Sequence, residues 1–293
     1  MIGARDERCR RIMTRFAKDF ILNVAFTGAV SDNRRNAAVP YTIDEIVADA
    51  ASCAKAGATI GHFHVRTKSG AATNDPDLYA ELFRALRAEP DVADLVLVAS
   101  TSGRHGQTLE QRAAVLDLPS DARPDMASLT LSSLNFATGP SINHPDDIIA
   151  LAQKMQANGI VPELEVFDLG MVAYLNHLVE KGTLNGPFYV NAILGLPAGA
   201  QADLLTVGTM MAQLPCDALV CLGGVGKWQL PAHFLAVAGA NGLRTGLEDN
   251  LRRQDGTTLT TNLELTKHAV ELVHLAGRRP MRPRDFRSQM LLR

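Results

Sequence analysis

Two histidines separated by one residue are the first side chains in this sequence whose spacing could do chemistry. His62 and His64 end an apolar run that predicts a β-strand. Side chains alternate between the two faces of a strand, so both imidazoles point to the same side. Two imidazoles on one face are a ready pair of metal ligands. The competing interpretation is two buried histidines satisfied by hydrogen bonds, and the pair alone favours neither.

Short apolar runs that alternate with helical segments supply the elements that must position this pair. The apolar runs predict strands at 20–26, 58–65, 95–99, 126–131, 160–166, 188–193, 216–222 and 241–244. Helix signals predict helices at 42–57, 76–88, 108–116, 145–158, 170–180, 202–214, 231–238 and 259–275. Eight strands alternating with eight helices in 293 residues predict an α/β fold of the (β/α)8 TIM-barrel type.

An open, doubly wound sheet is the structural alternative to the barrel. That fold predicts a glycine-rich turn of the form G-x-G-x-x-G after the first strand. Thr27-Gly28-Ala29 stands at this place and does not fit the motif. No long linker divides residues 19–293, which we therefore expect to form one catalytic domain, preceded by a polar extension at 1–18 in which Met13 offers a second possible start.

The composition is that of an ordinary soluble globular protein. Hydrophobic residues make up 46% of the chain and charged residues 20%, and the formal net charge is −2. No apolar run reaches the roughly 18 residues of a membrane helix, and the small net charge argues against a nucleic-acid partner. The four cysteines have neither the C-x-x-C spacing of a zinc site nor the pattern of a disulfide framework, so we expect a cytoplasmic location.

Polar residues gather where the predicted strands end, which is the active face of a TIM barrel. Besides the two histidines, these strand ends carry Thr27, Arg66, Ser100, Thr101, Ser128, Thr130, Glu163, Glu165, Asn191 and Arg244. Closure of the barrel brings strand eight beside strand one, so Glu248 can reach His62 and His64. Two histidines and one carboxylate leave a coordination position open, which is typical of a catalytic zinc.

Asp249 follows the candidate ligand Glu248 and could serve as a base. Arg244 and Zn²⁺ nearby are expected to lower its pKa, and a metal-bound carbonyl would make the neighbouring proton acidic. The alternative is that Asp249 caps a helix. Arg66 could form a salt bridge with a mouth carboxylate such as Glu165, and the glycine-rich segment 223–227 before a helix could bind a phosphate.

A longer series of motifs carries a family resemblance. In order along the chain they are Thr27-Gly28-Ala29, His62-x-His64-x-Arg66, Ser100-Thr101, Ser128, Ser133-Leu134-Asn135-Phe136, Asn143-His144-Pro145, Pro162-Glu163-Leu164-Glu165-Val166, Gly224-Val225-Gly226-Lys227-Trp228 and Gly246-Leu247-Glu248-Asp249-Asn250. With these motifs the chain resembles the β-keto acid cleavage enzymes, whose founding activity is 3-keto-5-aminohexanoate cleavage. The resemblance runs from about Phe20 to the C-terminal helix.

The resemblance implies a homotetrameric TIM barrel with Zn²⁺ at its mouth. It implies His62, His64 and Glu248 as metal ligands and Asp249 as the catalytic base. It also implies Arg244 as the arginine beside the reacting centre and Glu165 as a mouth carboxylate. Ser100, Thr101 and Ser128 match positions that contact the substrate.

The implied reaction converts a β-keto acid and acetyl-CoA into acetoacetate and a new acyl-CoA. The base removes the proton between the two carbonyl carbons, the enolate attacks the acetyl thioester, and a retro-Claisen cleavage follows after CoA moves to the former keto carbon. Zinc would act as the Lewis acid. The founding enzyme has a glutamate where this chain has Val30, which argues against an aminated substrate.

Two other classes of function remain open from the sequence. Metal-dependent amidohydrolases also use H-x-H in a barrel, but on strand one, with a lysine on strand four and histidines on strands five and six. Here the pair is on strand two, and the ends of strands four to six carry no lysine or histidine. A non-catalytic barrel stabilised by metal is the second alternative, and it predicts that removal of Asp249 changes nothing measurable.

Overall fold

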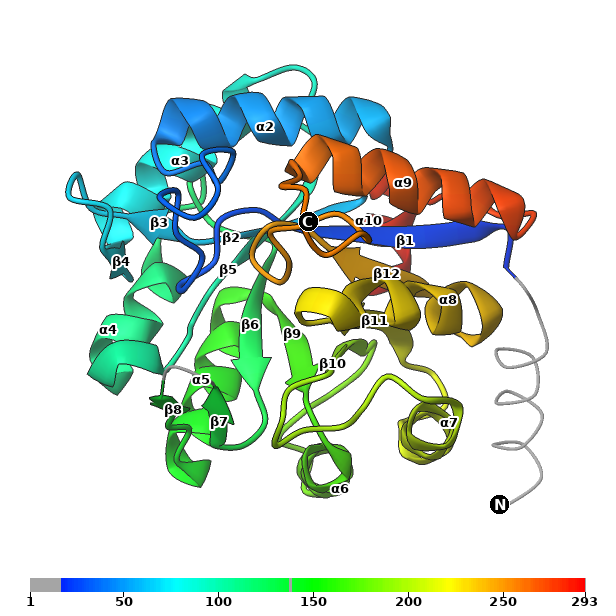
Figure 1. Ribbon diagram of the computed structural model, residues 1–293. Coiled ribbons are helices and arrows are strands. Elements are labelled where there is room, and N and C mark those ends of the chain that lie inside the picture. Colours follow the sequence, from blue (N-terminus) through cyan, green and yellow to red (C-terminus); the bar gives the residue numbers. More distant parts are fainter. Residues whose placement is uncertain (1–16, 137–138, 293) are drawn as a thin grey trace.

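The computed structural model describes residues 17–136 and 139–292, and parallel strands form a closed barrel at its centre (Figure 1). The barrel strands are β1 (Asp19–Ala25), β2 (Ile60–Phe63), β5 (Val96–Ala99), β6 (Met126–Thr130), β9 (Val161–Val166), β10 (Tyr189–Leu194), β11 (Leu219–Gly224) and β12 (Gly242–Thr245). Each pairs with the next, and β12 pairs with β1 to close the ring. The predicted (β/α)8 fold is confirmed, and the open-sheet alternative is wrong. Residues 1–16 of the predicted polar extension lie outside the described residues.

A helix follows each barrel strand and packs on the outside of the ring. These helices are α2 (Ile43–Ala56), α3 (Pro76–Ala88), α4 (Leu109–Ala113), α5 (Pro145–Asn158), α6 (Leu169–Glu180), α7 (Leu204–Gln213), α8 (Gln229–Gly239) and α9 (Asn262–Leu275). Thr42 and Glu45 form the predicted capping box of α2, and Gly57 ends that helix with a φ of 119°. Helix α4 is shorter than predicted because the chain continues as a 3₁₀ turn over Ala114–Asp117.

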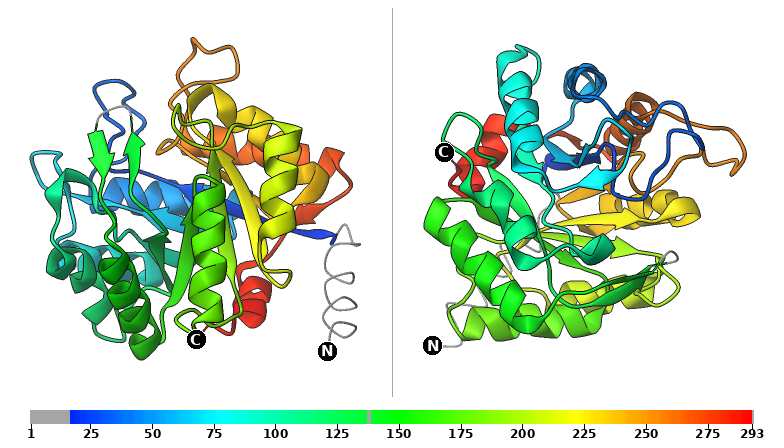
Figure 2. Two further views of the ribbon diagram at one scale, coloured as in Figure 1. Left: turned by 90° about the horizontal axis from the view of Figure 1, so that it is seen from below. Right: turned by 90° about the vertical axis from the view of Figure 1, so that its left-hand side faces the viewer.

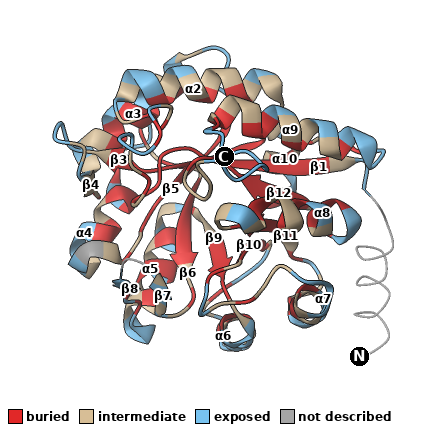
Figure 3. Cartoon of the chain, in the orientation of Figure 1, coloured by how far each residue is buried: buried red, intermediate tan, exposed pale blue. Residues whose placement is uncertain are grey.

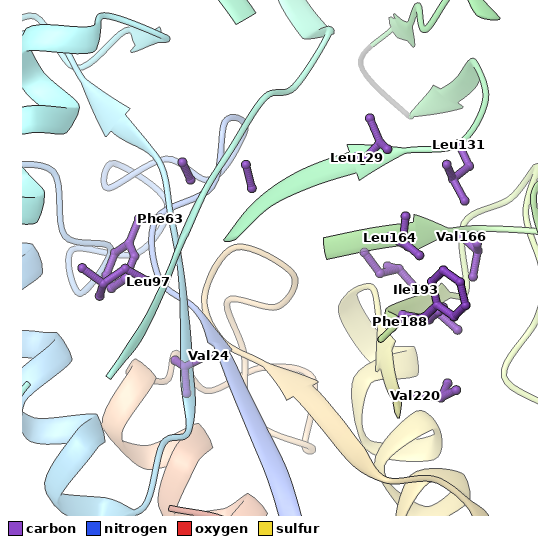
Figure 4. Close-up of a cluster of buried hydrophobic side chains, with 14 of the residues drawn as sticks. Val24, Phe63, Leu97, Leu129, Leu131, Leu164, Val166, Phe188, Ile193 and Val220 are labelled. Atoms are coloured by element: carbon purple, nitrogen blue, oxygen red, sulfur yellow. The ribbon is translucent and has the colours of Figure 1, made fainter. Parts of the chain in front are cut away.

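The alternation of side chains along each strand divides the barrel into two environments. Outward residues such as Val24, Phe63 and Leu97 join the apolar layer between barrel and helices (Figure 4). Inward residues near the amino ends of the strands, such as Ile21 and Ile60, fill the lower part of the barrel with apolar side chains. Figure 3 shows the resulting pattern, in which the strands are buried and the outer helix faces are exposed. Polar inward residues therefore lie above this apolar layer, from the middle of the strands to their carboxyl ends.

A short C-terminal helix, α10 (Pro283–Met290), lies across the lower end of the barrel and was absent from the prediction (Figure 2, left). Its Phe286 is fully buried and meets the ring of Tyr189 edge-on at 5.4 Å. The preceding segment β13 (Arg279–Pro280) pairs with β1. These apolar contacts close the floor of the barrel, so the opposite end is the one that can admit a ligand.

Two small ribbons stand at the mouth of the barrel. One joins β3 (Val65–Arg66) to β4 (Ala72–Thr73), and the other joins β7 (Leu134–Phe136) to β8 (Gly139–Ser141). The β7–β8 hairpin projects beyond the ends of the barrel strands, at the end opposite α10 (Figure 2, left). Both ribbons lie in segments that were expected to be strand ends or loops. Within the described part of the chain, no helix combines the length and apolarity needed to cross a bilayer.

Candidate functional site

The two histidines of the H-x-H motif meet at the carboxyl end of β2. His62 and His64 are 1% and 5% exposed, and their Nε2 atoms lie 3.4 Å apart. His62 pairs its Nδ1 with Glu163 Oε2 at 2.6 Å. Because a carboxylate accepts, Nδ1 carries the donated proton and Nε2 faces His64. The same-side orientation predicted from the alternation of strand residues is thus confirmed.

Glu163 is the hub of a buried hydrogen-bond network inside the barrel. It is fully buried, and its Oε1 accepts from Asn23 Nδ2 at 2.8 Å and from Asn191 Nδ2 at 2.6 Å. Burial raises the pKa of Glu163, but the charge and hydrogen bond of His62 outweigh it, so the net pKa is lowered. Burial lowers the pKa of His62, but the negative charges of Glu163 and Glu248 together outweigh burial, so the net pKa of His62 is raised. This carboxylate therefore fixes the tautomer and orientation of His62.

The segment after β12 supplies two acidic groups to the same place. Arg244 Nη2 lies 3.1 Å from Glu248 Oε1, and Arg244 Nε donates to Asp249 Oδ2 at 2.8 Å. Glu248 is held by close packing, since a Cβ on Gly28 (φ +70°) would lie 2.7 Å from its Cγ. At Gly246 (φ +128°) a Cβ would lie 2.1 Å from a backbone oxygen of β1. These glycines allow the loops after β1 and β12 to touch.

Glu248 completes a set of three groups that suits a metal ion. Its Oε1 lies 3.4 Å from His64 Nε2, and its Oε2 lies 3.8 Å from His62 Nε2. Four ligands about 2.0–2.1 Å from a tetrahedral Zn²⁺ lie roughly 3.3 Å from one another, close to these separations. Oε2 of Glu248 is buried without a hydrogen-bond partner. An unpaired carboxylate oxygen beside two imidazole nitrogens is the donor set that a cation would satisfy.

A second geometric group, made by His62, Glu163 and Glu165, is a weaker candidate for a metal. Glu163 already accepts three hydrogen bonds, and Glu165 Oε2 accepts from Thr130 Oγ1 at 2.7 Å. Glu165 Oε1 lies 3.7 Å from Arg244 Nη1. These carboxylates therefore support the site from within the protein.

The charges around Arg244 set the protonation of the acidic groups. Burial raises the pKa of Glu248, yet His64 and Arg244 outweigh it and hold the pKa well below its usual value. Burial also raises the pKa of Asp249, and there Arg244 does not fully compensate, so the net pKa is raised. The lowering expected for the pKa of Asp249 depends on a bound Zn²⁺ as well as on Arg244, and Arg244 alone does not produce it. The carboxylate of Asp249 contacts Arg244, and no helix begins at Asn250 or Leu251, so the interpretation of Asp249 as a helix cap is wrong.

These groups face a cavity of about 700 Å³ at the mouth of the barrel. The polar part of its wall includes His62, His64, Ser100, Thr130, Glu165, Arg244, Glu248 and Asp249. An apolar part is formed by Phe136, Phe167, Ile193, Leu196 and Val225. The cavity has the size and mixed lining of a small-molecule site.

Some predicted residues take other places. Thr101 and Ser128 lie behind the cavity wall, where Thr101 Oγ1 donates to the Ser128 carbonyl at 2.6 Å. Arg66 does not pair with Glu165, because its guanidinium donates to the carbonyls of Gly28, Ser31 and Gly70. The roles of Thr101 and Ser128 as substrate contacts stay predictions, whereas the Arg66–Glu165 salt bridge was wrong.

The glycine-rich segment 223–227 also differs from the prediction. Residues 223 and 224 continue β11, so they are strand rather than loop. The amides of Val225, Gly226 and Trp228 donate to the carbonyls of Leu194, Asp249 and Val225. These amides are consequently not free to bind a phosphate, and that interpretation of the segment is wrong.

Two residues of the site were not assigned a role from the sequence. Glu163 could have been found from the E-x-E spacing of β9, since it shares the inward face of the strand with Glu165. Arg104 lines the cavity just after β5, and its guanidinium lies 3.5 Å above the ring of Phe136. No strand or helix pattern singles out Arg104, because it falls in a 3₁₀ turn.

Comparisons with known proteins give a consistent assignment. A family model described as beta-keto acid cleavage enzyme matches residues 19–292. The 3-keto-5-aminohexanoate cleavage enzyme of Fusobacterium nucleatum subsp. nucleatum is 31% identical over 93% of this chain and 98% of its own length. The 3-oxoadipate:acetyl-CoA acetyltransferase of Cupriavidus necator is 33% identical over 88% of this chain and 89% of its own length.

Solved structures support the fold. The apo structure of ObcA superposes with a TM-score of 0.75 at 20% identity, over 87% of this chain and 66% of ObcA. This chain thus spans about two thirds of that longer protein. A binary complex of ObcA with oxaloacetate gives a TM-score of 0.76 at 19% identity, over 87% of this chain and 67% of that chain.

Proposed function

The chain belongs to the β-keto acid cleavage enzyme family, and from that premise we propose that it transforms a β-keto acid and acetyl-CoA into acetoacetate and a new acyl-CoA. The observation that carries this proposal is the contact of Arg244 with both Glu248 and Asp249, beside two buried histidines. A candidate metal ligand and a candidate base therefore adjoin one another in one cavity. That combination suits removal of a proton next to a carbonyl group.

His62, His64 and Glu248 are the residues that would hold a Zn²⁺. When bound, the ion would supply Lewis-acid polarisation of the keto acid. Glu163 holds His62 in the tautomer that presents Nε2 to the other two ligands. Arg244 pairs with Glu248 and keeps its carboxylate in place.

Asp249 is proposed as the base that removes the proton between the keto carbon and the carboxylate. Its carboxylate accepts a hydrogen bond from Arg244 Nε, which fixes it beside the candidate ligand Glu248. The carbanion then attacks the thioester carbonyl of acetyl-CoA and releases the CoA thiolate. The thiolate attacks the former keto carbon, the bond between that carbon and the α-carbon of the keto acid breaks, and the α-carbon takes back a proton to give acetoacetate. Arg244 Nη1 is buried without a hydrogen-bond partner, so it can donate to an oxygen of the substrate. Ser100 and Glu165 line the same wall and are proposed to orient the substrate.

The rim of the cavity suits the phosphates of acetyl-CoA. Arg35, Lys227 and Arg252 line it and are exposed. Within residues 17–136 and 139–292, none of the three forms an ion pair with a carboxylate. Their charges can attract the anionic co-substrate from solution.

A homo-oligomer, in the form of a tetramer, is also part of the proposal. It is supported by apolar side chains exposed on neighbouring helices: Leu204 and Leu205 on α7 are 79% and 80% exposed, and Phe234 on α8 is 54% exposed. Light scattering of the purified protein would test this assembly. A single-chain mass would contradict it.

A direct assay tests the proposed reaction. Purified protein supplied with Zn²⁺ is incubated with acetyl-CoA and a panel of β-keto acids whose far ends are neutral, cationic or anionic. We expect acetoacetate and one new acyl-CoA in equal amounts with at least one substrate. Absence of acetoacetate across the whole panel, with metal bound, would defeat the proposal. An Asp249→Asn variant as active as the wild type would favour a role for the barrel without this base.

A further inference from the structure

Arg104 is a positive charge in the cavity wall that the proposed reaction does not use. It begins the 3₁₀ turn Arg104–Gly106 after β5. Its guanidinium stacks on the ring of Phe136, which meets the ring of Phe167 edge-on at 5.8 Å. Phe136 belongs to the β7–β8 hairpin that stands beyond the ends of the barrel strands. Arg104 therefore lies toward the hairpin side of the cavity rather than on the barrel floor.

The N–H groups of the Arg104 guanidinium have no hydrogen-bond acceptor within the described chain. Among residues 17–136 and 139–292, its side chain forms no hydrogen bond and no ion pair. Two other arginines near the mouth have fixed acceptors: Arg112 donates to the Thr101 carbonyl and to Asn143, and Arg66 donates to three carbonyls. Arg104 is partly buried, and a guanidinium partly withdrawn from water is stabilised by charge-assisted hydrogen bonds to an anion. The open donors of Arg104 thus indicate an anionic ligand.

The acidic groups of the cavity are not available as that partner. Glu165, Glu248 and Asp249 influence Arg104 only through space, and all three lie near Arg244. Arg104 is more than an ion-pair distance from each of them. Its charge is consequently free to select what enters the cavity.

The ring of Phe136 under Arg104 and its neighbour Phe167 belong to the apolar part of the wall. Phe136, Phe167, Ile193 and Leu196 are apolar, and Val30 lines the cavity from the loop after β1. A positively charged substrate end at this place would be repelled by the charge of Arg104. A carboxylate at that end would form charge-assisted hydrogen bonds with the arginine fork.

The reacting carboxylate of a β-keto acid has a different place to bind. The candidate metal ligands lie at the strand ends, together with the unpartnered Nη1 of Arg244. These groups match the reacting end of the substrate. Arg104, stacked on the hairpin, is left for the other end. We propose that Arg104 binds a second carboxylate there, so that this enzyme selects dicarboxylic β-keto acids. This inference rests on the proposed function.

Three six-carbon β-keto acids that differ at the far end provide the test. 3-Oxoadipate ends in a carboxylate, 3-oxohexanoate in a methyl group, and 3-keto-5-aminohexanoate carries an amine. The ratio kcat/KM is measured for each with saturating acetyl-CoA, for the wild type, Arg104→Ala and Arg104→Lys. Arg35→Ala, which removes another cavity-lining arginine, is the matched control, and the melting temperature of each variant reports folding.

A hydrogen-bonded charge pair predicts that the wild type prefers 3-oxoadipate over 3-oxohexanoate by about tenfold to a hundredfold. Arg104→Ala should reduce this ratio to about one, and Arg104→Lys should leave part of it. The control Arg35→Ala should leave the ratio unchanged, whatever it does to the overall rate. Binding of 3-oxoadipate without acetyl-CoA, measured by calorimetry, should weaken in Arg104→Ala by a similar factor.

Two outcomes would overturn the inference while the proposed function stands. One is turnover of 3-oxohexanoate or the amine as efficient as that of 3-oxoadipate by the wild type. The other is an equal decrease in kcat/KM for all three substrates in a folded Arg104→Ala protein. That result would mean that Arg104 binds the reacting carboxylate, which all three substrates share. Absence of acetoacetate from every substrate would instead count against the proposed function, and the inference would fall with it.

Discussion

Glu163 Oε2 lies 2.6 Å from Nδ1 of His62, and both side chains are closed off from solvent. The pair joins β2 to β9 across the inside of the barrel. It leaves Nε2 of His62 as the nitrogen that faces His64 and Glu248. The tautomer of His62, a candidate metal ligand, is thus set by Glu163, which does not itself line the cavity.

A prediction about metal affinity follows from this contact. Glu163→Gln keeps the shape of the side chain but removes the charge that orients and polarises His62. Loss of such a supporting carboxylate typically lowers metal affinity by about 10–100-fold. We expect a decrease of that size in a competition titration with a zinc chelator.

The neighbouring substitution Glu165→Gln is the matched control, because Glu165 bonds to Thr130 instead of His62. It should leave zinc affinity close to that of the wild type. Equal affinities for Glu163→Gln and the wild type, with both proteins folded, would contradict the supporting role of Glu163.

The role of Asp249 predicts a loss of rate without a loss of metal. Asp249→Asn removes the proposed base, and a positioned base contributes about 10²–10⁴-fold to a rate. We expect kcat to fall within that range while elemental analysis still finds zinc. Asp249→Glu keeps a carboxylate and should retain more activity than Asp249→Asn. A variant that loses zinc and activity together would place Asp249 among the metal ligands instead.

His233 predicts how stability depends on pH. Burial lowers its pKa to about 4, and its Nε2 donates to the Arg244 carbonyl at 2.9 Å. The folded state therefore binds a proton more weakly than the unfolded chain, whose histidine has a pKa of 6.5. The contribution of neutral His233 to the free energy of unfolding is fully present above pH 6.5 and is lost as the pH falls toward 4. A shift of this size corresponds to about 3 kcal/mol.

Urea unfolding at several pH values between 7 and 4 checks this expectation. The free energy of unfolding should fall less steeply in His233→Gln than in the wild type, since the amide can still donate but does not titrate. His274→Gln, at an exposed site on α9, serves as control and should follow the wild type. Parallel curves for His233→Gln and the wild type would show that His233 does not control this range.

The barrel was predictable because its signals are local. Thr42 with Glu45, and Gly57, marked the ends of α2 in the sequence itself, and the structure confirms both caps. Helix α10 was missed because its short segment is rich in arginine and has few apolar residues, although Phe286 buries fully against Tyr189. Its position depends on a contact with a distant strand.

The site was predictable only where strand periodicity or family motifs marked a residue. His62, His64 and Glu248 converge as expected from barrel closure. Arg104 was not predicted because its importance comes from a stacking partner on another element and from the absence of a bonding partner in the described chain. The burial that raises the pKa of Asp249 when no Zn²⁺ is bound was also not predicted, because the depth of burial cannot be read from its neighbours in sequence.

The fate of a labelled acetyl group tests the central claim most directly. Acetyl-CoA carrying ¹³C in the acetyl carbonyl is incubated with 3-oxoadipate and the zinc-supplied enzyme, and the products are followed by NMR. The proposed reaction places the label in the ketone carbon of acetoacetate and leaves the acyl group of the new acyl-CoA unlabelled. Label in the new acyl-CoA, or cleavage of the keto acid without acetyl-CoA, would contradict it.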